Sequence, residues 1–269
     1  MNRPTPAADR PTISVVIPVK NDARLLARCL AALAAQTVTA DEIIVVDNGS
    51  TDASATVALE AGAVVVPCAH LGIPAAAATG YDAASGDLIL RLDADCIPEA
   101  TWIAEMRAAF AARADVSVFT GGARFIDGPS ALRTLLAAVY LATYTAFGAP
   151  ALGHLPVFGS NLGFRRSAWR SIRTTAHRSD AELHDDLDLS YHFGEHHRIR
   201  ALPAARMGIS MRPFASGRGF ARRMWRGVRT VVVHWPADLP PVRWQRLLRR
   251  RLRHHGAALP ATPSGRVRR

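Results

Sequence analysis

Cysteine is scarce in this chain. The three cysteines, Cys29, Cys68 and Cys96, form no Cys-X-X-Cys pair and are odd in number. Both features argue against a disulfide framework and against a zinc site. A reducing cytosol is the compartment that fits them best, so the sequence predicts a cytoplasmic protein.

Three further features are missing. The first residues, MNRPTPAADRPT, contain no apolar segment of the kind that a secretory signal needs, so none is expected. Neither a Gly-X-Gly-X-X-Gly nor a Walker A motif follows the first apolar run, which weakens dinucleotide-binding and P-loop interpretations. The best candidate for a membrane span, LLAAVYLATYTAFGAPAL from Leu135, carries threonines, a glycine and a proline, and we interpret it as a buried or interfacial helix.

Acidic residues are absent from two arginine-rich stretches near the C-terminus, MRPFASGRGFARRMWRGVR and RWQRLLRRRLRHHG. They account for much of the net charge of +11 and contain or adjoin Trp225, Trp235 and Trp244. Such a stripe suits anionic lipid headgroups, phosphorylated ligands or nucleic acid, and a solvated helix with a tail is the alternative. A peripheral position at the inner face of the membrane is therefore one expectation, whereas nucleic acid is not an expected partner.

The sequence does contain the alternation of strand-like and helix-like segments that is typical of βαβ proteins. With 269 residues and 49% hydrophobic content, the chain can bury the core of one large domain or of a domain with an appended segment. From Ile13 to Leu92, β-branched apolar runs alternate with alanine-rich stretches of helical periodicity. The pattern predicts an α/β fold with a Rossmann-like, mostly parallel sheet and helices on both faces, followed by a helical, arginine-rich C-terminal segment.

Polar side chains follow three of the predicted strands where each strand ends: Asn21 with Asp22, Asp47 with Asn48, and Asp93 with Asp95. Open α/β sheets bind ligands at this edge. A divalent cation on Asp95, with Asp93, would bridge the protein to a nucleotide diphosphate and stabilise a diphosphate leaving group. Acids in a surface turn are the alternative interpretation.

Asp47 lies in the motif VVDNGSTD, where Gly49 permits a tight turn. Its carboxylate suits the imide N–H of a pyrimidine or a ribose hydroxyl. Helix capping is the alternative, although the serine, threonine and aspartate that follow already explain the cap.

A second acidic cluster lies in HDDLDLSYHF, where Asp185, Asp186 and Asp188 fall in a predicted first helical turn. The helix dipole favours negative charge there, so N-terminal capping is one interpretation. Displacing a diphosphate with a hydroxyl requires a general base, and crowding raises the pKa of at least one carboxylate toward a useful value. We favour the base.

Five motifs together resemble family 2 glycosyltransferases of the GT-A fold over residues 12–235. They are VVIPVKND, VVDNGSTD, GDLILRLDADC, GSNLGFRRSAW and HDDLDLSYHF, in that order. The resemblance implies transfer of a sugar from a nucleoside diphosphate sugar to an acceptor hydroxyl, usually with inversion, assisted by Mn²⁺ or Mg²⁺. It divides the chain into a nucleotide-sugar-binding half (12–120), an acceptor-side half (121–235) and a basic tail (236–269).

On the donor side, the resemblance implies that Pro18 and Asn21 line the nucleotide cleft and that Asp47 contacts the base. Asp93 and Asp95 match the motif that holds metal and diphosphate. Asn161, in the Gly-Ser-Asn turn, matches the segment that lines the donor sugar and acceptor cleft.

For the chemistry, the family's Glu-Asp pair aligns with Asp185 and Asp186, so Asp186 is the expected base and Asp188 is structural. Late in the chain, His234 is a candidate metal ligand, with His154 or no histidine as the alternatives. Guanidinium groups suit phosphate oxygens. The arginines expected to close over the diphosphate, unless they form a solvated helix face, are Arg218, Arg222 and Arg223.

The chain departs from the family pattern in three ways. Ala77-Ala78 replaces an Arg-Asn that relatives often carry, and Asp185 replaces the usual glutamate of the pair. The Gln-X-X-Arg-Trp signature of processive synthases is absent, so one sugar is expected per encounter, passed to an acceptor hydroxyl that the basic tail suggests is lipid-linked. The rival functions are a nucleotidyltransferase and an inactive basic module that binds a membrane surface or nucleic acid.

Overall fold

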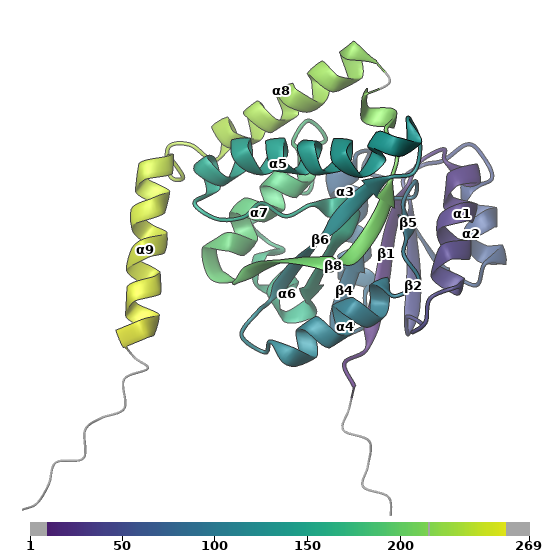
Figure 1. The fold of residues 1–269 in the computed structure, drawn as a ribbon, viewed down its shortest axis with the longest axis horizontal. Coiled ribbons are helices and arrows are strands. Elements are labelled where there is room, and N and C mark those ends of the chain that lie inside the picture. Colours follow the sequence, from purple (N-terminus) through teal and green to yellow (C-terminus); the bar gives the residue numbers. More distant parts are fainter. Residues whose placement is uncertain (1–9, 215, 257–269) are drawn as a thin grey trace, which may run out of the picture.

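The computed structural model describes residues 10–214 and 216–256 and contains one mixed sheet (Figure 1). The order of its eight strands is β3-β2-β1-β4-β7-β6-β8-β5. The strands are β1 (Ile13–Val19), β2 (Glu42–Asp47), β3 (Val64–Pro67), β4 (Leu88–Arg91), β5 (Ile97–Pro98), β6 (Val118–Phe125), β7 (Leu162–Arg165) and β8 (Ile199–Ile209). The first four strands are parallel to one another, and β7 runs antiparallel to its neighbours β4 and β6.

Helices cover both faces of this sheet, as the sequence predicts. They are α1 (Ala23–Ala34), α2 (Ser54–Glu60), α3 (Ile73–Ala83), α4 (Trp102–Ala112), α5 (Arg133–Leu152), α6 (Arg166–Ile172), α7 (Asp185–His196), α8 (Gly217–Val233) and α9 (Pro240–Gly256). Successive residues of a strand face opposite sides of the sheet, so Val15 and Ile17 join one core while Val16 joins the other.

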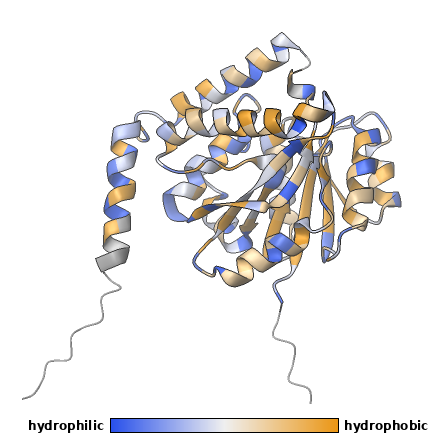
Figure 2. Cartoon of the chain, viewed as in Figure 1, coloured by the Kyte–Doolittle hydropathy of each residue, from blue (hydrophilic) through white to orange (hydrophobic). Residues whose placement is uncertain are grey.

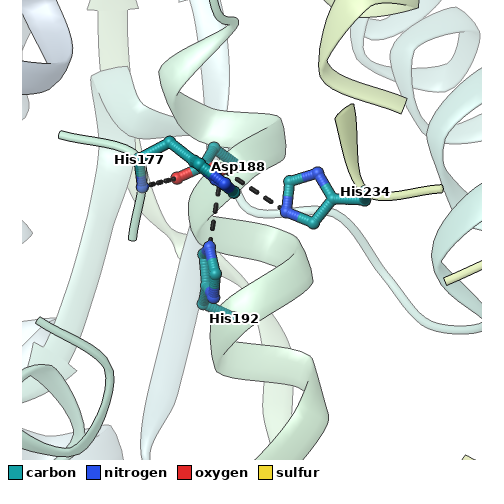
Figure 3. Close-up of side chains that lie close together, drawn as sticks. All are labelled: His177, Asp188, His192 and His234. Carbon is teal, nitrogen blue, oxygen red and sulfur yellow. Dashed lines mark hydrogen bonds and ion pairs between the residues drawn. The ribbon is translucent and has the colours of Figure 1, made fainter. Parts of the chain in front are cut away.

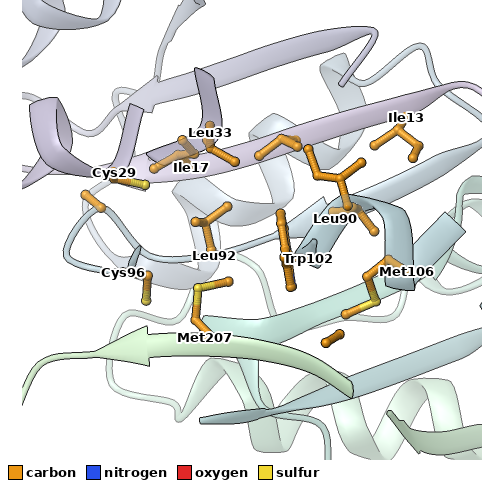
Figure 4. Packing of buried hydrophobic residues seen from close by; sticks show 14 of the residues in the cluster. Ile13, Ile17, Cys29, Leu33, Leu90, Leu92, Cys96, Trp102, Met106 and Met207 are labelled. Atoms are coloured by element: carbon orange, nitrogen blue, oxygen red, sulfur yellow. The ribbon is translucent and has the colours of Figure 1, made fainter. Parts of the chain in front are cut away.

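The first core lies between the sheet and helices α1, α2 and α4 (Figure 4). Cys29 and Leu33 of α1 and Trp102 and Met106 of α4 are fully or almost fully buried there, at the spacing that places residues on one side of a helix. The second core holds α3, α6 and α7. Because β1, β2 and β4 run parallel, their carboxyl ends lie at the same edge of the sheet. The helices packed on both faces hold this edge in place.

Helix α5 is not the buried helix that was one of the two expectations. Leu135, Val139 and Phe147 on it are more than half exposed. Among the described residues, the segment Ser130–Leu152 is long and apolar enough to cross a membrane, judged by length and composition, and 22% of its most apolar window is buried. The interfacial interpretation stays a prediction.

The predicted basic tail begins with an ordered helix rather than with free chain. In α9 the guanidinium of Arg243 is buried and donates to the carbonyl oxygens of Leu152 (2.7 Å) and Tyr191 (2.8 Å). These bonds attach α9 to the end of α5 and to the middle of α7. The rest of the tail, 257–269, lies outside the described residues.

Candidate active site

The loops after β1 and β2 are joined by hydrogen bonds that fix their shape. Asn21 has a positive φ of 52°, which asparagine tolerates better than most residues. Its side-chain oxygen accepts from the Thr51 N–H (2.7 Å), and its own N–H donates to the Ser50 hydroxyl (3.0 Å). Asn21 therefore holds two loops of the sheet edge together.

Asp47 ends β2 beside this junction. One of its carboxylate oxygens accepts from the Ser50 N–H at 3.0 Å, so part of the side chain forms the turn itself. Its register partner in β1 is Val19, the residue after Pro18. The structure thus brings Pro18, Asn21 and Asp47 to one end of the sheet, as the sequence predicts.

Arg91 is the residue that organises the two acidic clusters, and sequence reasoning missed it. It is the last residue of β4, with a side chain 2% exposed. Its guanidinium binds Asp93 (3.2 Å), Asp186 (3.1 Å) and Asp185. The acids that follow β4 and those that begin α7 therefore meet at one buried cation.

The sequence did contain a signal for the role of Arg91, because this charged residue lies inside the otherwise apolar run GDLILRL. A guanidinium in a buried strand requires acidic partners, because an unpaired charge is strongly disfavoured away from water. The sequence did not reveal which acids those were.

Asp93 and Asp95 bind different partners. Asp93 also accepts from the Ser160 hydroxyl at 2.6 Å, which ties it to the Gly-Ser-Asn turn. Asp95 pairs with Arg212 at 2.8 Å, and the same guanidinium reaches Asp22 at 2.6 Å. Arg212 follows β8, is half exposed, and was also missed by the sequence analysis.

The electrostatics of both clusters favour an added positive charge. Burial, reinforced by the charge of Asp93, raises the pKa of Asp95. Burial also raises the pKa of Asp185 to about 6, helped by Asp186 and opposed by the Arg91 guanidinium. One carboxyl of the pair therefore has a raised pKa, as the sequence predicts, but burial is the main cause and crowding contributes less.

Other predicted residues lie elsewhere. Asn161 is fully buried, where its amide donates to the carbonyl oxygens of Gly122 (2.8 Å) and Ala205 (2.7 Å) and accepts from Trp102 (2.8 Å). These bonds support a structural role for its side chain. The neighbouring Ser160 is the member of this turn that reaches the acidic site.

The basic residues singled out from the C-terminal half are also dispersed. Arg222 binds Glu182 at 2.6 Å, and Arg218 is exposed on the first turn of α8. His234 lies 3.4 Å from Asp188, in a cluster separate from Asp93 and Asp95. His234 is therefore not grouped with the predicted metal ligands Asp93 and Asp95, and the closure of Arg218 and Arg222 over a diphosphate stays a prediction.

Two remaining predictions concern His154 and the alanine pair. The Nε2 of His154 lies 3.2 Å from the Arg243 guanidinium at the base of α9. Ala77 and Ala78 are buried in α3, within the second core. At this position the chain therefore has small side chains that pack in the core.

Residues 14–173 match the family described as Glycosyl transferase family 2. The chain belongs to this family. Glycosyltransferase AglE of Haloferax volcanii is 35% identical to this family 2 member over 101 residues, which are 35% of this chain and 33% of that protein. The Putative glycosyltransferase EpsH of Bacillus subtilis is 27% identical over 187 residues, 67% of this chain and 53% of that protein. The chain thus spans between a third and about half of these curated relatives.

Solved structures also resemble this family 2 member over most of its length. Glucosyl-3-phosphoglycerate synthase from Mycobacterium tuberculosis, solved with Mn²⁺, uridine diphosphate and phosphoglyceric acid, has a TM-score of 0.60 at 20% identity, covering 83% of this chain and 78% of that one. A mycobacterial protein reaches a TM-score of 0.61 at 19% identity, covering 82% and 74%. At such identities the likeness establishes the fold, which is GT-A.

The residues of this family 2 member fit the divalent metal that the GT-A fold implies. Asp93 and Asp95 offer carboxylate oxygens within 4.8 Å of one another, and hard divalent cations prefer oxygen ligands. Burial and the charge of Asp93 raise the pKa of Asp95 although Arg212 is in contact, and a bound cation would offset the repulsion between the two carboxylates. The neighbouring Cys96 thiol belongs to the first core and is 1% exposed.

Proposed function

We propose that this chain transfers one sugar from a nucleoside diphosphate sugar to an acceptor hydroxyl with inversion of the anomeric carbon. The observation that carries the proposal is the shared contact of Arg91 with Asp93 and Asp186. Through this contact Asp93, proposed to bind the metal and the leaving diphosphate, lies near Asp186, proposed to accept the proton of the acceptor hydroxyl. A direct displacement needs both within one substrate's length.

In this proposal Asp93 and Asp95 hold Mn²⁺ or Mg²⁺. When bound, the ion neutralises charge on the departing diphosphate. Arg212 is half exposed and already lies against Asp95, so its guanidinium is placed to bind phosphate oxygens once a donor enters. Asp47 and Pro18, at the same edge, would face the nucleoside.

Asp186 accepts the proton of the acceptor hydroxyl as that oxygen attacks the anomeric carbon. The new carbon–oxygen bond forms while the bond to the diphosphate breaks, and the nucleoside diphosphate leaves with the electron pair. Arg91 holds Asp186 and Asp185 in place from beneath. No motif of a processive synthase is present, which supports release after one transfer.

The pH dependence of this reaction should separate catalysis from stability. As pH falls through about 6, Asp185 takes up a proton beside the proposed base, and its ion pair with Arg91, which helps to hold Asp186, weakens, so kcat/KM should fall. A carboxyl whose pKa is raised in the folded state contributes stability that is present below its unfolded pKa, about 4, and lost as pH rises through about 6. Rate profiles and thermal midpoints over about pH 3.5–8, a range that brackets both values, check this. A rate that stays flat down to pH 5 (roughly one unit below the pKa) would contradict it.

The acceptor side favours an apolar molecule. A cavity of about 550 Å³ lies between α5 and α8, and its walls are mainly apolar side chains such as Leu136, Phe220 and Val228. His184, the residue before Asp185, also lines it, as does Arg223. The cavity therefore reaches the residue that precedes the acid pair, and we propose that it receives the hydrocarbon part of a lipid or lipid-linked acceptor.

The outer surface of α8 and α9 supports a location at a membrane. Trp225 and Val232 on α8, and Trp244 and Leu248 on α9, are each about half exposed or more. Neither helix contains an acidic residue, and apolar and hydrophilic positions alternate along both (Figure 2). Basic amphipathic helices of this kind lie in the headgroup region of anionic bilayers.

Vesicle binding tests this location. The chain should bind phosphatidylglycerol vesicles more tightly than phosphatidylcholine vesicles, and added salt should weaken the binding. Replacing Trp225 or Leu248 with Ser should each lower the partition coefficient about tenfold, because each loses about 1.5 kcal/mol of apolar burial. Leu59→Ser on α2, an equally exposed leucine at the opposite side of the molecule, is the matched control (Figure 1). Equal losses in all three variants would remove α8 and α9 as the membrane face.

The donor is identified by thermal shift with a panel of nucleoside diphosphates and their sugars, with and without Mn²⁺. Uridine diphosphate and Mn²⁺ are the first to test, because the structurally similar synthase was solved with both. A ligand that binds the folded state raises its melting temperature. Binding of duplex DNA with no stabilisation by any nucleotide would favour the inactive basic module instead.

A further inference from the structure

Three histidines surround one buried aspartate where α7 meets the end of α8 (Figure 3). Asp188 and His192 lie one turn apart on α7, and His177 precedes this helix. The Asp188 carboxylate lies 2.7 Å from His177 Nδ1, 3.5 Å from His192 Nε2 and 3.4 Å from His234 Nε2. All four side chains point toward a common centre.

The hydrogen bond of His234 fixes which of its nitrogens is the donor. Nδ1 lies 2.8 Å from the Thr230 carbonyl oxygen, and a carbonyl only accepts, so Nδ1 carries the hydrogen. The ring is also held by stacking on Tyr191, with centroids 3.9 Å apart. Nε2 is left facing Asp188, buried and without a hydrogen-bond partner in the described part of the chain.

His192 is oriented in the same way. The hydroxyl of Thr175 donates to the Ile172 carbonyl oxygen at 3.0 Å and accepts from His192 Nδ1 at 3.3 Å. Nε2 of His192 is likewise buried and has no hydrogen-bond partner among the described residues. In their neutral forms, both imidazoles direct a lone pair at the carboxylate of Asp188, an arrangement that is repulsive unless a cation lies between them.

We propose that His177, Asp188, His192 and His234 bind Zn²⁺ in a tetrahedral site distinct from the Asp93–Asp95 pair. With metal–ligand bonds of about 2.05 Å, tetrahedral ligand atoms lie roughly 3.3 Å apart. The two nitrogens at 3.4 and 3.5 Å from the carboxylate oxygen already match that separation. Imidazole with one carboxylate suits zinc better than it suits the magnesium or manganese expected at the aspartate pair.

Four protein ligands make this a closed, structural site rather than a catalytic one. The Nδ1 atoms of His234 and His192 donate to Thr230 and Thr175, and hydrogen bonds of this kind orient the histidines that ligate metals. The site would clamp the end of α8 and the loop after α6 to α7. Helix α7 begins with Asp185 and Asp186, and α8 lines the apolar cavity, so the metal would hold the acceptor side together.

Metal analysis of the untagged, full-length chain tests the proposal. An Asp93→Asn/Asp95→Asn double variant serves as background, so that bound zinc reports on the histidine cluster alone. After chelation and dialysis, this background should take up one Zn²⁺ per chain and gain in melting temperature. Adding His192→Gln or His234→Gln should weaken zinc binding by about a hundredfold or more, because changes even beyond the ligands cost 10–100-fold. Co²⁺ in the same site should give the intense visible absorption of tetrahedral coordination.

His196→Gln is the matched control, since His196 is an exposed histidine on the same helix. It should retain one zinc ion and the full gain in melting temperature. Absence of zinc uptake by the double variant would overturn the proposal and leave a cluster held by protons alone. Unchanged zinc affinity in the folded His192 and His234 variants would overturn it equally, as would octahedral Co²⁺ spectra.

Discussion

Asp186→Asn is expected to lower kcat about a thousandfold, because general base catalysis contributes a factor of 10²–10⁴. Asparagine keeps the size of the side chain and an oxygen that accepts from Arg91, now 3.1 Å from Asp186. In the proposed function, Asp93, Asp95 and the loops after β1 and β2 bind the donor, so the affinity for the donor should stay unchanged. Steady-state kinetics with calorimetry of the nucleoside diphosphate measure the two effects separately.

Asp115→Asn is the control for this substitution. Asp115 is an exposed carboxylate that pairs with Arg113 and Arg198, and turnover should not change when it is replaced. Turnover of Asp186→Asn within a factor of about two of the parent would remove Asp186 as the base, since a general base contributes at least about a hundredfold. Loss of nucleotide binding in that variant would instead assign Asp186 to the donor site.

Arg91→Met should lower the free energy of unfolding by about 3–5 kcal/mol, the cost of leaving partners of a buried ion pair uncompensated. Methionine fills part of the space but leaves Asp93, Asp185 and Asp186 crowded and without their shared cation. The loss should be largest near neutral pH and shrink as pH falls below 6, because protonated carboxyls no longer repel one another. Urea unfolding at several pH values measures both effects.

Arg178→Met supplies the comparison for this stability change. Arg178 also pairs with an aspartate, Asp82, but its side chain is 35% exposed, so water replaces the lost partner. Its loss of stability should be much smaller. Equal effects of the two substitutions, or no change with pH for Arg91→Met, would show that Arg91 does not hold the acidic clusters together.

The fold was predictable because hydrophobic periodicity reports directly on burial. The run EIIVVD becomes β2 and DARLLARCLAALAAQ contains α1, with Leu26, Cys29, Leu30 and Leu33 buried. Polar residues after β1, β2 and β4 do reach one edge of the sheet, because parallel strands end together. The order of the motifs predicted the family, and the match of the family model to residues 14–173 confirms it.

Contacts between distant segments were not predictable from local patterns. Nothing near Asp95 in the sequence indicates Arg212 as its partner, and Asn161 looks like a loop residue although its amide satisfies three buried groups. The cysteine count argued against a zinc site, yet it does not bear on histidines. His177, His192 and His234 lie far apart along the chain, and only packing of α7 against the end of α8 gathers them.

The central claim is that the edge formed by Asp93 and Asp95 binds a nucleoside diphosphate through a divalent metal. Calorimetry with uridine diphosphate and the other nucleoside diphosphates, with and without Mn²⁺, tests it most directly in the parent chain and in Asp95→Asn. We expect Mn²⁺ to strengthen binding of one nucleotide strongly in the parent and in Asp186→Asn, and to have no effect in Asp95→Asn. Binding that is equally tight without Mn²⁺, or equally metal-dependent in Asp95→Asn, would contradict the account.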